Sequence, residues 1–219
     1  LKFEYYDYIP VLSLRDIPLH SPINAFIKRS FDIVFSLVVI LGLLSWLTPL
    51  LAIIITLESK GPVFFRQTRN GLDNREFYCY KFRSMAPNTY ADHISATKND
   101  MRVTKVGKFI RRTSIDELPQ FYNVLFGTMS VVGPRPHMVK HTNEYSDRIN
   151  KYMVRHFVKP GITGLAQVRG YRGEIEKHAD IQNRIKFDVF YIENWSMFLD
   201  LKIIIQTIIN ALAGESKAY

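Results

Sequence analysis

The longest hydrophobic stretch of the chain runs from Ile33 to Leu57 and contains no ionisable residue. About 20 residues of helix cross the hydrocarbon core of a bilayer, so this stretch is long enough to form a membrane helix. A soluble helix of that length without a charged residue is uncommon. The pattern therefore favours insertion in a membrane over burial in a soluble core.

Basic residues flank this stretch on both sides. Arg15, Lys28 and Arg29 precede it, and Lys60 and Arg66 are among those that follow. Because such residues collect on the cytoplasmic side of a membrane, both ends of the stretch are expected to face that side.

A proline inside the stretch offers a way to bring both ends to one face. Pro49 removes a backbone hydrogen bond and bends the helix, and the hydroxyl of Thr48 is expected to return part of the lost bonding. A helix broken at Thr48 and Pro49 could enter and leave the membrane on the same side. The sequence favours this re-entrant form, and a kinked spanning helix is the alternative.

Shorter patterns predict the other elements. In chain order they are an extended linker at 1–27, two strands at 61–71 and 75–85 around a turn at Gly71–Asn74, a loop or short helix at 86–101, two helices and a rigid turn within 105–136, a turn-rich stretch at 158–170, and helices at 174–194 and 194–212. The last helix is apolar apart from Asp200, Lys202, Gln206 and Asn210. It fits core packing and an interfacial position at a bilayer equally well.

Composition limits the functional classes. A chain of 219 residues with 47% hydrophobic residues can bury a core, which excludes wholesale disorder. The single cysteine, Cys79, excludes an internal disulfide and fits a reducing compartment. The net charge of +9 attracts anions such as nucleic acid, anionic lipid or a phosphorylated substrate. The chain begins at Leu1 without a secretory signal pattern, and we expect it to be the end piece of a longer protein.

The segment RRTSIDELPQ, residues 111–120, places two adjacent carboxylates beside arginines. Ser114 and Glu117 have the spacing of a capping box, which would explain both residues structurally. That reading explains Asp116 less well. Adjacent carboxylates at a helix start could bind a divalent cation or attack phosphorus, so both readings stay open.

Further cations follow predicted strand and turn positions. Strand periodicity places Lys81 and Arg83 on one face, where they suit a phosphate site or protect a sheet edge. In the segment GPRP, prolines stiffen the backbone around Arg135, which suits either a phosphate clamp or a structural turn. His137 and His141 are four residues apart, but no further ligand type lies nearby, so we favour a structural role over zinc. No Walker loop, G-x-G-x-x-G or G-x-S-x-G motif occurs.

Taken together, these segments resemble the bacterial polyprenyl-phosphate sugar-phosphate transferases, the monotopic phosphoglycosyl transferases. The matching blocks, in order, are KRSFD, QTRNG, YKFRSM, IRRTSIDELPQFYNVLFGTMSVVGPRP, KPGITGLAQVRG and DLKIIIQTI. They extend from Lys28 to the C-terminal region. One departure is Thr48-Pro49, where the family often has Ser-Pro at the break of its membrane helix.

The resemblance implies a mechanism and site residues. Asp116 would attack the β-phosphate of a UDP-sugar, release UMP and carry the sugar phosphate covalently. Glu117 would help to bind Mg²⁺ or activate the acceptor, and the metal site would comprise Asp116 and Glu117. Undecaprenyl phosphate would then accept the sugar phosphate. The residues expected to bind phosphate are Lys81, Arg83, Arg112, Arg135 and Arg169.

The resemblance also implies an architecture and a location. The fold class is α+β, a mainly helical catalytic domain with a small hairpin or sheet, a re-entrant membrane segment and interfacial amphipathic helices. The expected divisions are a linker at 1–27, the membrane segment at 28–60 and the catalytic domain at 61–219. The protein would act on the cytoplasmic face of the bacterial inner membrane, with membrane lipid but no nucleic acid as a partner, and it could form a homo-oligomer.

The expected subgroup transfers glucose 1-phosphate in exopolysaccharide assembly, and galactose or an N-acetylated sugar is the alternative donor sugar. Two other classes compete with an enzyme. A membrane-tethered module could bind anionic lipid without catalysis, and a basic nucleic-acid-binding protein would need no detergent for extraction.

Overall fold

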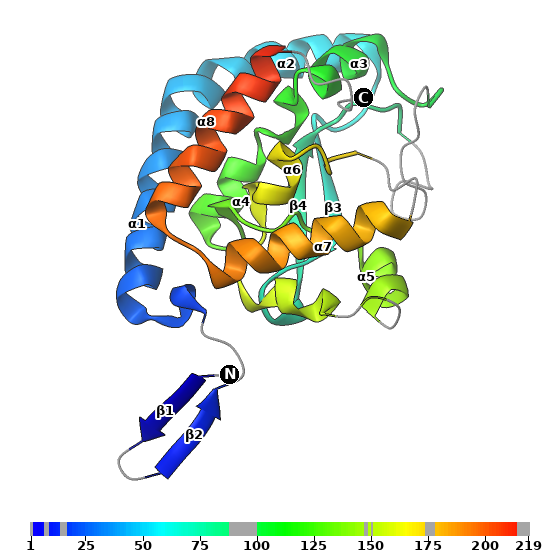
Figure 1. Ribbon diagram of the computed structural model, residues 1–219. Coiled ribbons are helices and arrows are strands. Elements are labelled where there is room, and N and C mark those ends of the chain that lie inside the picture. Colours follow the sequence, from blue (N-terminus) through cyan, green and yellow to red (C-terminus); the bar gives the residue numbers. More distant parts are fainter. Residues whose placement is uncertain are drawn as a thin grey trace.

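A long bent helix runs along one side of the protein and over its top (Figure 1). The computed structural model describes residues 2–6, 9–13, 17–87, 100–146, 149, 151–173 and 178–213. Among these, Pro22–Glu58 is the one helix long and apolar enough to cross a membrane, and 17% of its most apolar window is buried inside the protein. It comprises α1 (Pro22–Val39), a π-helical turn η2 (Ile40–Leu44) and α2 (Ser45–Glu58).

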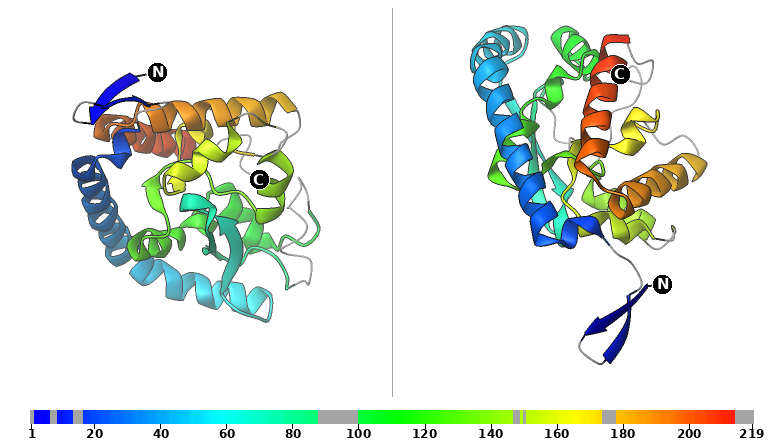
Figure 2. Two further views of the ribbon diagram at one scale, coloured as in Figure 1. Left: turned by 90° about the horizontal axis from the view of Figure 1, so that it is seen from below. Right: turned by 60° about the vertical axis from the view of Figure 1, so that its left-hand side comes forward.

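The helix bends where the π-helical turn joins α2, so that α1 and α2 lie at a marked angle in every view (Figure 2). A π-helical turn widens the helix, and Pro49 has no N–H to donate to the carbonyl of Ser45. The predicted break is therefore present as a change in direction, and its wide turn begins several residues before the proline.

The expected role of Thr48 in this bend is wrong. Its hydroxyl oxygen is buried and has no hydrogen-bond partner among the described residues. Two other side chains return bonds to the helix backbone. The hydroxyl of Ser45 donates to the carbonyl of Leu41 at 2.7 Å, and the indole of Trp46 donates to the carbonyl of Gly42 at 3.0 Å. Both carbonyls belong to the π-helical turn.

The inner and outer faces of α1 have the reverse of the usual polarity of a soluble helix. Its buried residues are Lys28, Asp32 and Ser36, which are spaced by four and share one face. Its exposed residues include Val34 (62%) and Val38 (66%). A helix that turns polar groups inward and apolar groups outward is typical of a lipid-facing segment.

The inner face of α2 joins the hydrophobic core. Leu47, Leu51 and Ile55 are buried there and belong to the same core cluster as Phe82 and Ile110 of the catalytic part. The bent helix and the rest of the fold therefore share one core, which fixes the orientation of the helix relative to the site.

The predicted strand pair is confirmed. Strand β3 (Phe64–Asn70) pairs antiparallel with β4 (Glu76–Phe82), with Phe64 opposite Phe82, and a short 3-10 turn η3 (Leu72–Asn74) connects them. Residues 88–99, in the stretch expected to be a loop or short helix, lie outside the described part of the chain.

Small elements follow and build the rest of the fold. In order they are α3 (Lys105–Arg112), η4 (Ile115–Glu117), α4 (Gln120–Phe126), β5 (Ser130–Val132), α5 (Val139–Ser146), η5 (Tyr152–Phe157), β6 (Gly161–Thr163) and α6 (Leu165–Val168). Strands β5 and β6 are parallel, and the predicted Gly-Pro-Arg-Pro turn directly follows β5.

Two long helices complete the fold, α7 (His178–Glu193) and α8 (Met197–Ala213). Helix α8 lies beside α1 in Figure 1, and the Nζ of Lys28 contacts Asp200 of α8 at 2.6 Å. At the other end of the chain, the expected extended linker at 1–27 is wrong in part. It contains the antiparallel strands β1 (Lys2–Tyr6) and β2 (Ile9–Ser13), a 3-10 turn η1 (Pro18–His20) and the start of α1.

Candidate active site

The acid pair lies on η4, a single 3-10 turn between α3 and α4. The residue before it, Ser114, has a φ of +59°, in the left-handed region that non-glycine residues rarely adopt. The expected capping box between Ser114 and Glu117 is wrong, because the Ser114 side chain caps nothing. Its hydroxyl instead accepts a hydrogen bond from Arg172 at 2.8 Å.

Glu117 lies at the centre of a cluster of cations from three parts of the chain. Lys81 of β4 contacts its carboxylate at 2.8 Å, and Arg135 of the turn after β5 makes two contacts at 2.7 and 3.2 Å. Arg172, beyond α6, reaches the same carboxylate at 3.3 Å. Three positive charges around one negative charge leave a surplus that can bind an anion.

These cations keep Glu117 ionised. Burial alone would raise the pKa of its carboxyl group, but Arg135, Lys81 and Arg172 together hold the pKa well below its ordinary value. A carboxylate with so low a pKa is a weak proton acceptor near neutral pH. Glu117 is therefore better placed to hold the three cations in position than to transfer a proton.

Asp116 is buried to the same degree as Glu117, but its contacts differ. It is 8% exposed, and no hydrogen bond or ion pair joins its carboxylate to another described residue. Burial raises the pKa of Asp116 to about 6, with a smaller increase from Glu117, and Lys81 opposes both. A carboxylate without partners, next to surplus positive charge, is available to bind a metal ion or attack phosphorus.

The acid pair lies between two helices that are each attached to the bent helix. At the C-terminal end of α2, Glu58 accepts hydrogen bonds from the backbone N–H groups of Lys105 and Val106, at the start of α3. Near the N-terminal end of α1, Arg29 donates to the carbonyls of Val124 and Leu125, at the end of α4.

Both connections are short. Helix α3 has eight residues and spans about 12 Å, and α4 has seven. One short helix on each side therefore connects the acid pair to the bent helix: α3 to its C-terminal half and α4 to its N-terminal half.

Arg83 does not join this cluster. It is buried and donates to the carbonyls of Ile55, Ser59 and Lys60, at the C-terminal end of α2. The expected common face for Lys81 and Arg83 fails because β4 ends at Phe82, so the alternation of a strand does not extend to Arg83.

Two other arginines expected at the site make no bond to the acid pair, and two unexpected ones act on it. The side chains of Arg112 and Arg169 are exposed and make no hydrogen bond in the described part of the chain. Arg111, one residue away, lowers the pKa of Asp116, and Arg172, three residues away, binds Glu117. The segments were identified correctly, but the choice between neighbouring arginines needs the helix and turn geometry.

The structural reading of His137 fits its contacts. Its Nδ1 lies 2.8 Å from the hydroxyl of Tyr152, and its Nε2 lies 3.5 Å from Arg184. The side chain of His141, its expected neighbour at four residues, is outside the described part of the chain.

Comparison with known proteins identifies a family for this site. A family described as "Bacterial sugar transferase" matches residues 23–214. A UDP-glucose:undecaprenyl-phosphate glucose-1-phosphate transferase of Klebsiella pneumoniae is 51% identical over 209 residues, which cover 95% of this chain and 44% of that protein.

Two other relatives differ in substrate or in length. A UDP-N-acetylgalactosamine-undecaprenyl-phosphate N-acetylgalactosaminephosphotransferase of Aeromonas hydrophila is 48% identical over 198 residues, 90% of this chain and 46% of that protein. An "Exopolysaccharide production protein PSS" of Rhizobium leguminosarum bv. phaseoli is 42% identical over 191 residues, 85% of this chain and 95% of that protein.

The chain spans less than half the length of the Klebsiella and Aeromonas relatives. The family match nevertheless covers most of the chain, and it includes the acid pair, the cations around it and both halves of the bent helix. The resemblance in the sequence motifs is thereby confirmed, and the chain belongs to the bacterial sugar transferase family.

Proposed function

We propose that this chain transfers a sugar 1-phosphate from a UDP-sugar to undecaprenyl phosphate and releases UMP. The proposed group is glucose 1-phosphate. The observation that carries the proposal is the contrast between two adjacent carboxylates. Glu117 is neutralised by three cations, whereas Asp116 has no partner among the described residues and lies beside the resulting positive charge.

In the first step, a carboxylate oxygen of Asp116 attacks the β-phosphorus of the UDP-sugar. The bond between that phosphorus and the oxygen that bridges the two phosphates breaks, and UMP leaves with this oxygen. The sugar phosphate stays on Asp116 as an acyl phosphate. Arg135, Arg172 and Lys81 offset the repulsion between carboxylate and diphosphate and stabilise the charge that develops.

In the second step, a phosphate oxygen of undecaprenyl phosphate attacks the same phosphorus. The bond to Asp116 breaks, the carboxylate is restored, and the product is a lipid-linked diphosphate sugar. A covalent intermediate lets a water-soluble donor and a membrane-bound acceptor use one site in turn. The low pKa of Glu117 supports its assignment as the residue that organises the cations in both steps.

The acid pair fits a Mg²⁺ ion of the kind found in phosphoryl-transfer sites. Such ions are held by one or two carboxylates together with substrate phosphates. Within the described ranges, no group of three or more His, Cys, Asp or Glu side chains could hold an ion alone, so the donor phosphates would complete the site. Asp116 would be the main protein ligand, with Glu117 nearby, and the ion would supply charge neutralisation at the diphosphate.

The bent helix is proposed to be a re-entrant anchor that places this site at the level of the lipid headgroups. Three observations support the anchor: the exposed apolar face of α1, the bend at the π-helical turn, and basic residues at both ends of the helix. Both ends would then lie on the cytoplasmic face of the inner membrane, together with the catalytic part.

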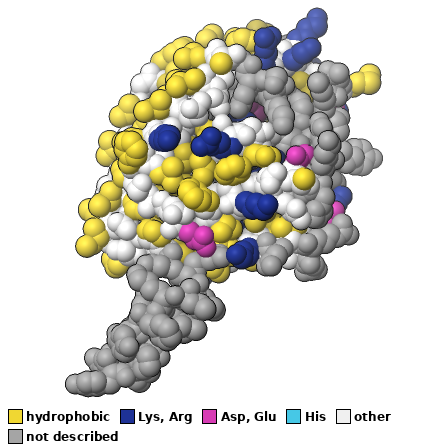
Figure 3. Space-filling view, in the orientation of Figure 1, with side chains coloured by type: hydrophobic (Ala, Val, Ile, Leu, Met, Phe, Trp, Pro, Cys, Tyr) yellow, Lys and Arg dark blue, Asp and Glu magenta, His cyan; other side chains and the backbone are white. Residues whose placement is uncertain are grey.

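Helix α8 is proposed to lie at the membrane interface beside this anchor. Phe198, Ile205 and Leu212 are exposed, the last of them 84%, whereas Asp200 and Ile203 of the same helix are buried. The space-filling view has apolar side chains along the left-hand and upper edges of the molecule, where α1 and α2 lie (Figure 3). Core packing, the alternative for this helix, explains the buried side of α8 but not its exposed apolar side.

The donor sugar is proposed to be glucose. The Klebsiella relative is named for UDP-glucose, and the Aeromonas relative, at a similar identity, is named for UDP-N-acetylgalactosamine. UDP-galactose and N-acetylated UDP-sugars are therefore the competing donors that an experiment has to include.

An assay of UMP release tests the proposed function. The protein, in nanodiscs with Mg²⁺ and undecaprenyl phosphate, is given UDP-glucose, UDP-galactose, UDP-N-acetylglucosamine or UDP-N-acetylgalactosamine in turn. We expect the fastest UMP release with UDP-glucose and release at background level after Asp116→Asn. Asp73→Asn is the matched control, because Asp73 is an exposed acid in a turn whose positive φ asparagine tolerates.

Two results would count against the proposal. Release of UMP that Asp116→Asn leaves unchanged would remove Asp116 from the chemistry. A protein that binds anionic vesicles but releases UMP from none of the four donors would be the lipid-binding module instead.

A further inference from the structure

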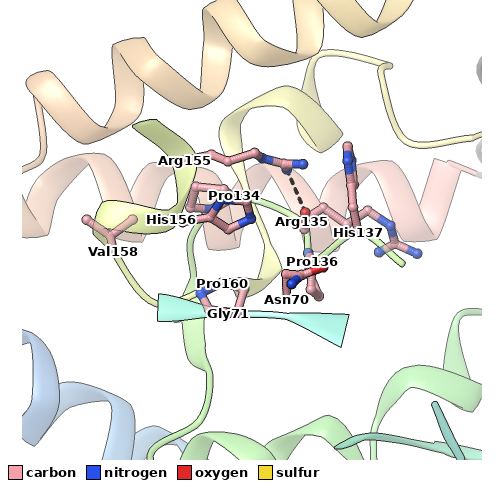
Figure 4. A pocket seen from close by; sticks show the side chains of 10 residues that line it. All are labelled: Asn70, Gly71, Pro134, Arg135, Pro136, His137, Arg155, His156, Val158 and Pro160. Carbon is pink, nitrogen blue, oxygen red and sulfur yellow. Dashed lines mark hydrogen bonds between the residues drawn. The ribbon is translucent and has the colours of Figure 1, made fainter. Parts of the chain in front are cut away.

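A buried ion pair supports the turn that carries Arg135. Arg155, on η5, donates from Nη2 to the carbonyl oxygen of Arg135 at 2.6 Å and to Asp188 Oδ2 at 2.9 Å. The Arg155 and Asp188 side chains are each 2% exposed. Figure 4 shows the guanidinium of Arg155 pointing at the backbone of this turn.

The other attachments of the turn act on its neighbouring peptides. The N–H of Gly133 donates to Thr163, and the carbonyl of Pro134 accepts from Gly161, both at 2.9 Å. Strand β6 thus holds the two residues before Arg135, while Arg155 holds the carbonyl of Arg135 itself. The direction in which the Arg135 side chain leaves the backbone depends on that peptide.

The remaining donors of Arg155 lie at a small cavity. Its Nε and Nη1 are buried without a partner in the described ranges, as is Nδ1 of the adjacent His156. All belong to side chains that line a small cavity with Asn70 and Pro134, of a size to accommodate about one water molecule (Figure 4).

We propose that Arg155, oriented by Asp188, is a positioning residue that sets where the guanidinium of Arg135 meets Glu117 and the donor diphosphate. The inference rests on the proposed function, because that function assigns Arg135 to the donor phosphates. Arg155 touches no substrate in this account and acts through the backbone of Arg135. A shift of the guanidinium by a fraction of an ångström weakens its contact with the donor.

A role limited to stability is the competing explanation, since a buried ion pair between η5 and α7 also holds the fold together. Both explanations expect a lower thermal midpoint when the pair is altered. They differ in whether the effect on the donor passes through Arg135.

A double-mutant cycle in nanodiscs separates the two. The first readout is kcat/KM for UMP release from UDP-glucose, and the second is the affinity for UDP alone, at a temperature where every variant is folded. Arg155→Lys keeps the charge but replaces the planar fork with a single ammonium group. We expect it to lower both readouts at least tenfold when Arg135 is present and less than twofold in an Arg135→Gln background. Asp188→Asn should show the same coupling.

Asp200→Asn is the matched control, because it alters another buried ion pair, with Lys28, whose side chains do not bond to residues 133–136 in the described part of the chain. It should lower the thermal midpoint but change both readouts by the same factor with and without Arg135. Equal losses for Arg155→Lys in both backgrounds, or coupling of Asp200→Asn to Arg135, would overturn the positioning role. If the native protein binds UDP but releases no UMP, the proposed function fails and the affinity cycle still decides this inference. If it does neither, both fail.

Discussion

Asp116 and Glu117 are adjacent in the chain, yet their surroundings make them chemically different. Three cations converge on Glu117 and keep it ionised, while burial opposes the charge on Asp116. The charge of Asp116 is thus unfavourable in the free protein, and a bound cation or a covalent bond to phosphorus would relieve it. At the scale of single residues, this contrast is the basis for proposing Asp116 as the nucleophile and Glu117 as the residue that organises the cations.

The raised pKa of Asp116 predicts how the reaction depends on pH. Attack on phosphorus needs the ionised carboxylate, and its pKa is about 6 in the free protein. We expect kcat/KM for UMP release to be constant well above pH 6 and to fall tenfold for each pH unit well below it. A pH profile measured between 4.5 and 8 checks this, and a rate that rises on acidification would contradict it.

The same shift predicts a conflict between stability and activity. The folded carboxyl group binds its proton more tightly than the unfolded one, so its contribution to the free energy of unfolding falls as pH rises from about 4 to about 6. Asp116→Asn removes the buried charge and should raise the free energy of unfolding at pH 8 by on the order of 3 kcal/mol, while abolishing activity. Thermal melts at pH 8 and pH 4.5 should show this gain shrinking toward acid. A stability gain of Asp116→Asn that is larger at pH 4.5 than at pH 8 would show that burial does not raise the pKa of Asp116.

At the scale of elements, the two halves of the bent helix organise the site. Helix α1 holds the end of α4 through Arg29, and α2 holds the start of α3 through Glu58. The acid pair lies between α3 and α4. The position of the proposed nucleophile is therefore tied to the helix that is proposed to contact lipid.

Arg83 supplies a prediction at this scale. Arg83→Gln leaves carbonyls at the C-terminal end of α2 without their charged donor, so the free energy of unfolding should fall by about 2 kcal/mol or more. The KM for UDP-glucose should stay within a factor of two, measured beside Arg135→Gln, which should raise it clearly. A large rise in KM for Arg83→Gln with unchanged stability would return Arg83 to the phosphate site.

Patterns with a regular period were predictable from the sequence. The long apolar helix, the β3–β4 pair and α8 all follow from hydrophobic spacing, and the acid pair and Arg135 follow from their charged motifs. The predictions failed where a period ends. Arg83 lies just beyond a strand, and Arg172 rather than Arg169 reaches Glu117 across 55 residues of sequence. The spacing of Ser114 and Glu117 predicted a capping box, but Ser114 adopts a left-handed φ and its side chain caps nothing.

At the scale of the whole molecule, the bent helix and the elements around the acid pair share one hydrophobic core. Leu44, Leu47, Leu51 and Ile55 of the bent helix belong to the main hydrophobic core, and Lys28 joins α1 to Asp200 of α8. Asp200 is buried, and this explains why α1 turns a polar residue, Lys28, inward to contact it. The exposed apolar faces of α1, α2 and α8 are the surface that the proposed anchor would turn toward the bilayer.

A labelling experiment tests the proposed topology of the anchor. Ser21→Cys and Lys60→Cys place thiols at the two exposed ends of the bent helix, and the native Cys79 is buried and protected from labelling. With a membrane-impermeant maleimide, both should react from the same side of sealed vesicles as Lys108→Cys in the catalytic part. Labelling of the two ends from opposite sides would establish a spanning helix instead.

Mass spectrometry of the protein incubated with Mg²⁺ and UDP-glucose, without lipid acceptor, tests the central claim most directly. The account predicts a hexose phosphate on the peptide that carries Asp116, absent from Asp116→Asn and discharged when undecaprenyl phosphate is added. UMP release on addition of the acceptor, with no adduct at any stage, would contradict the covalent route and leave direct transfer between the two substrates.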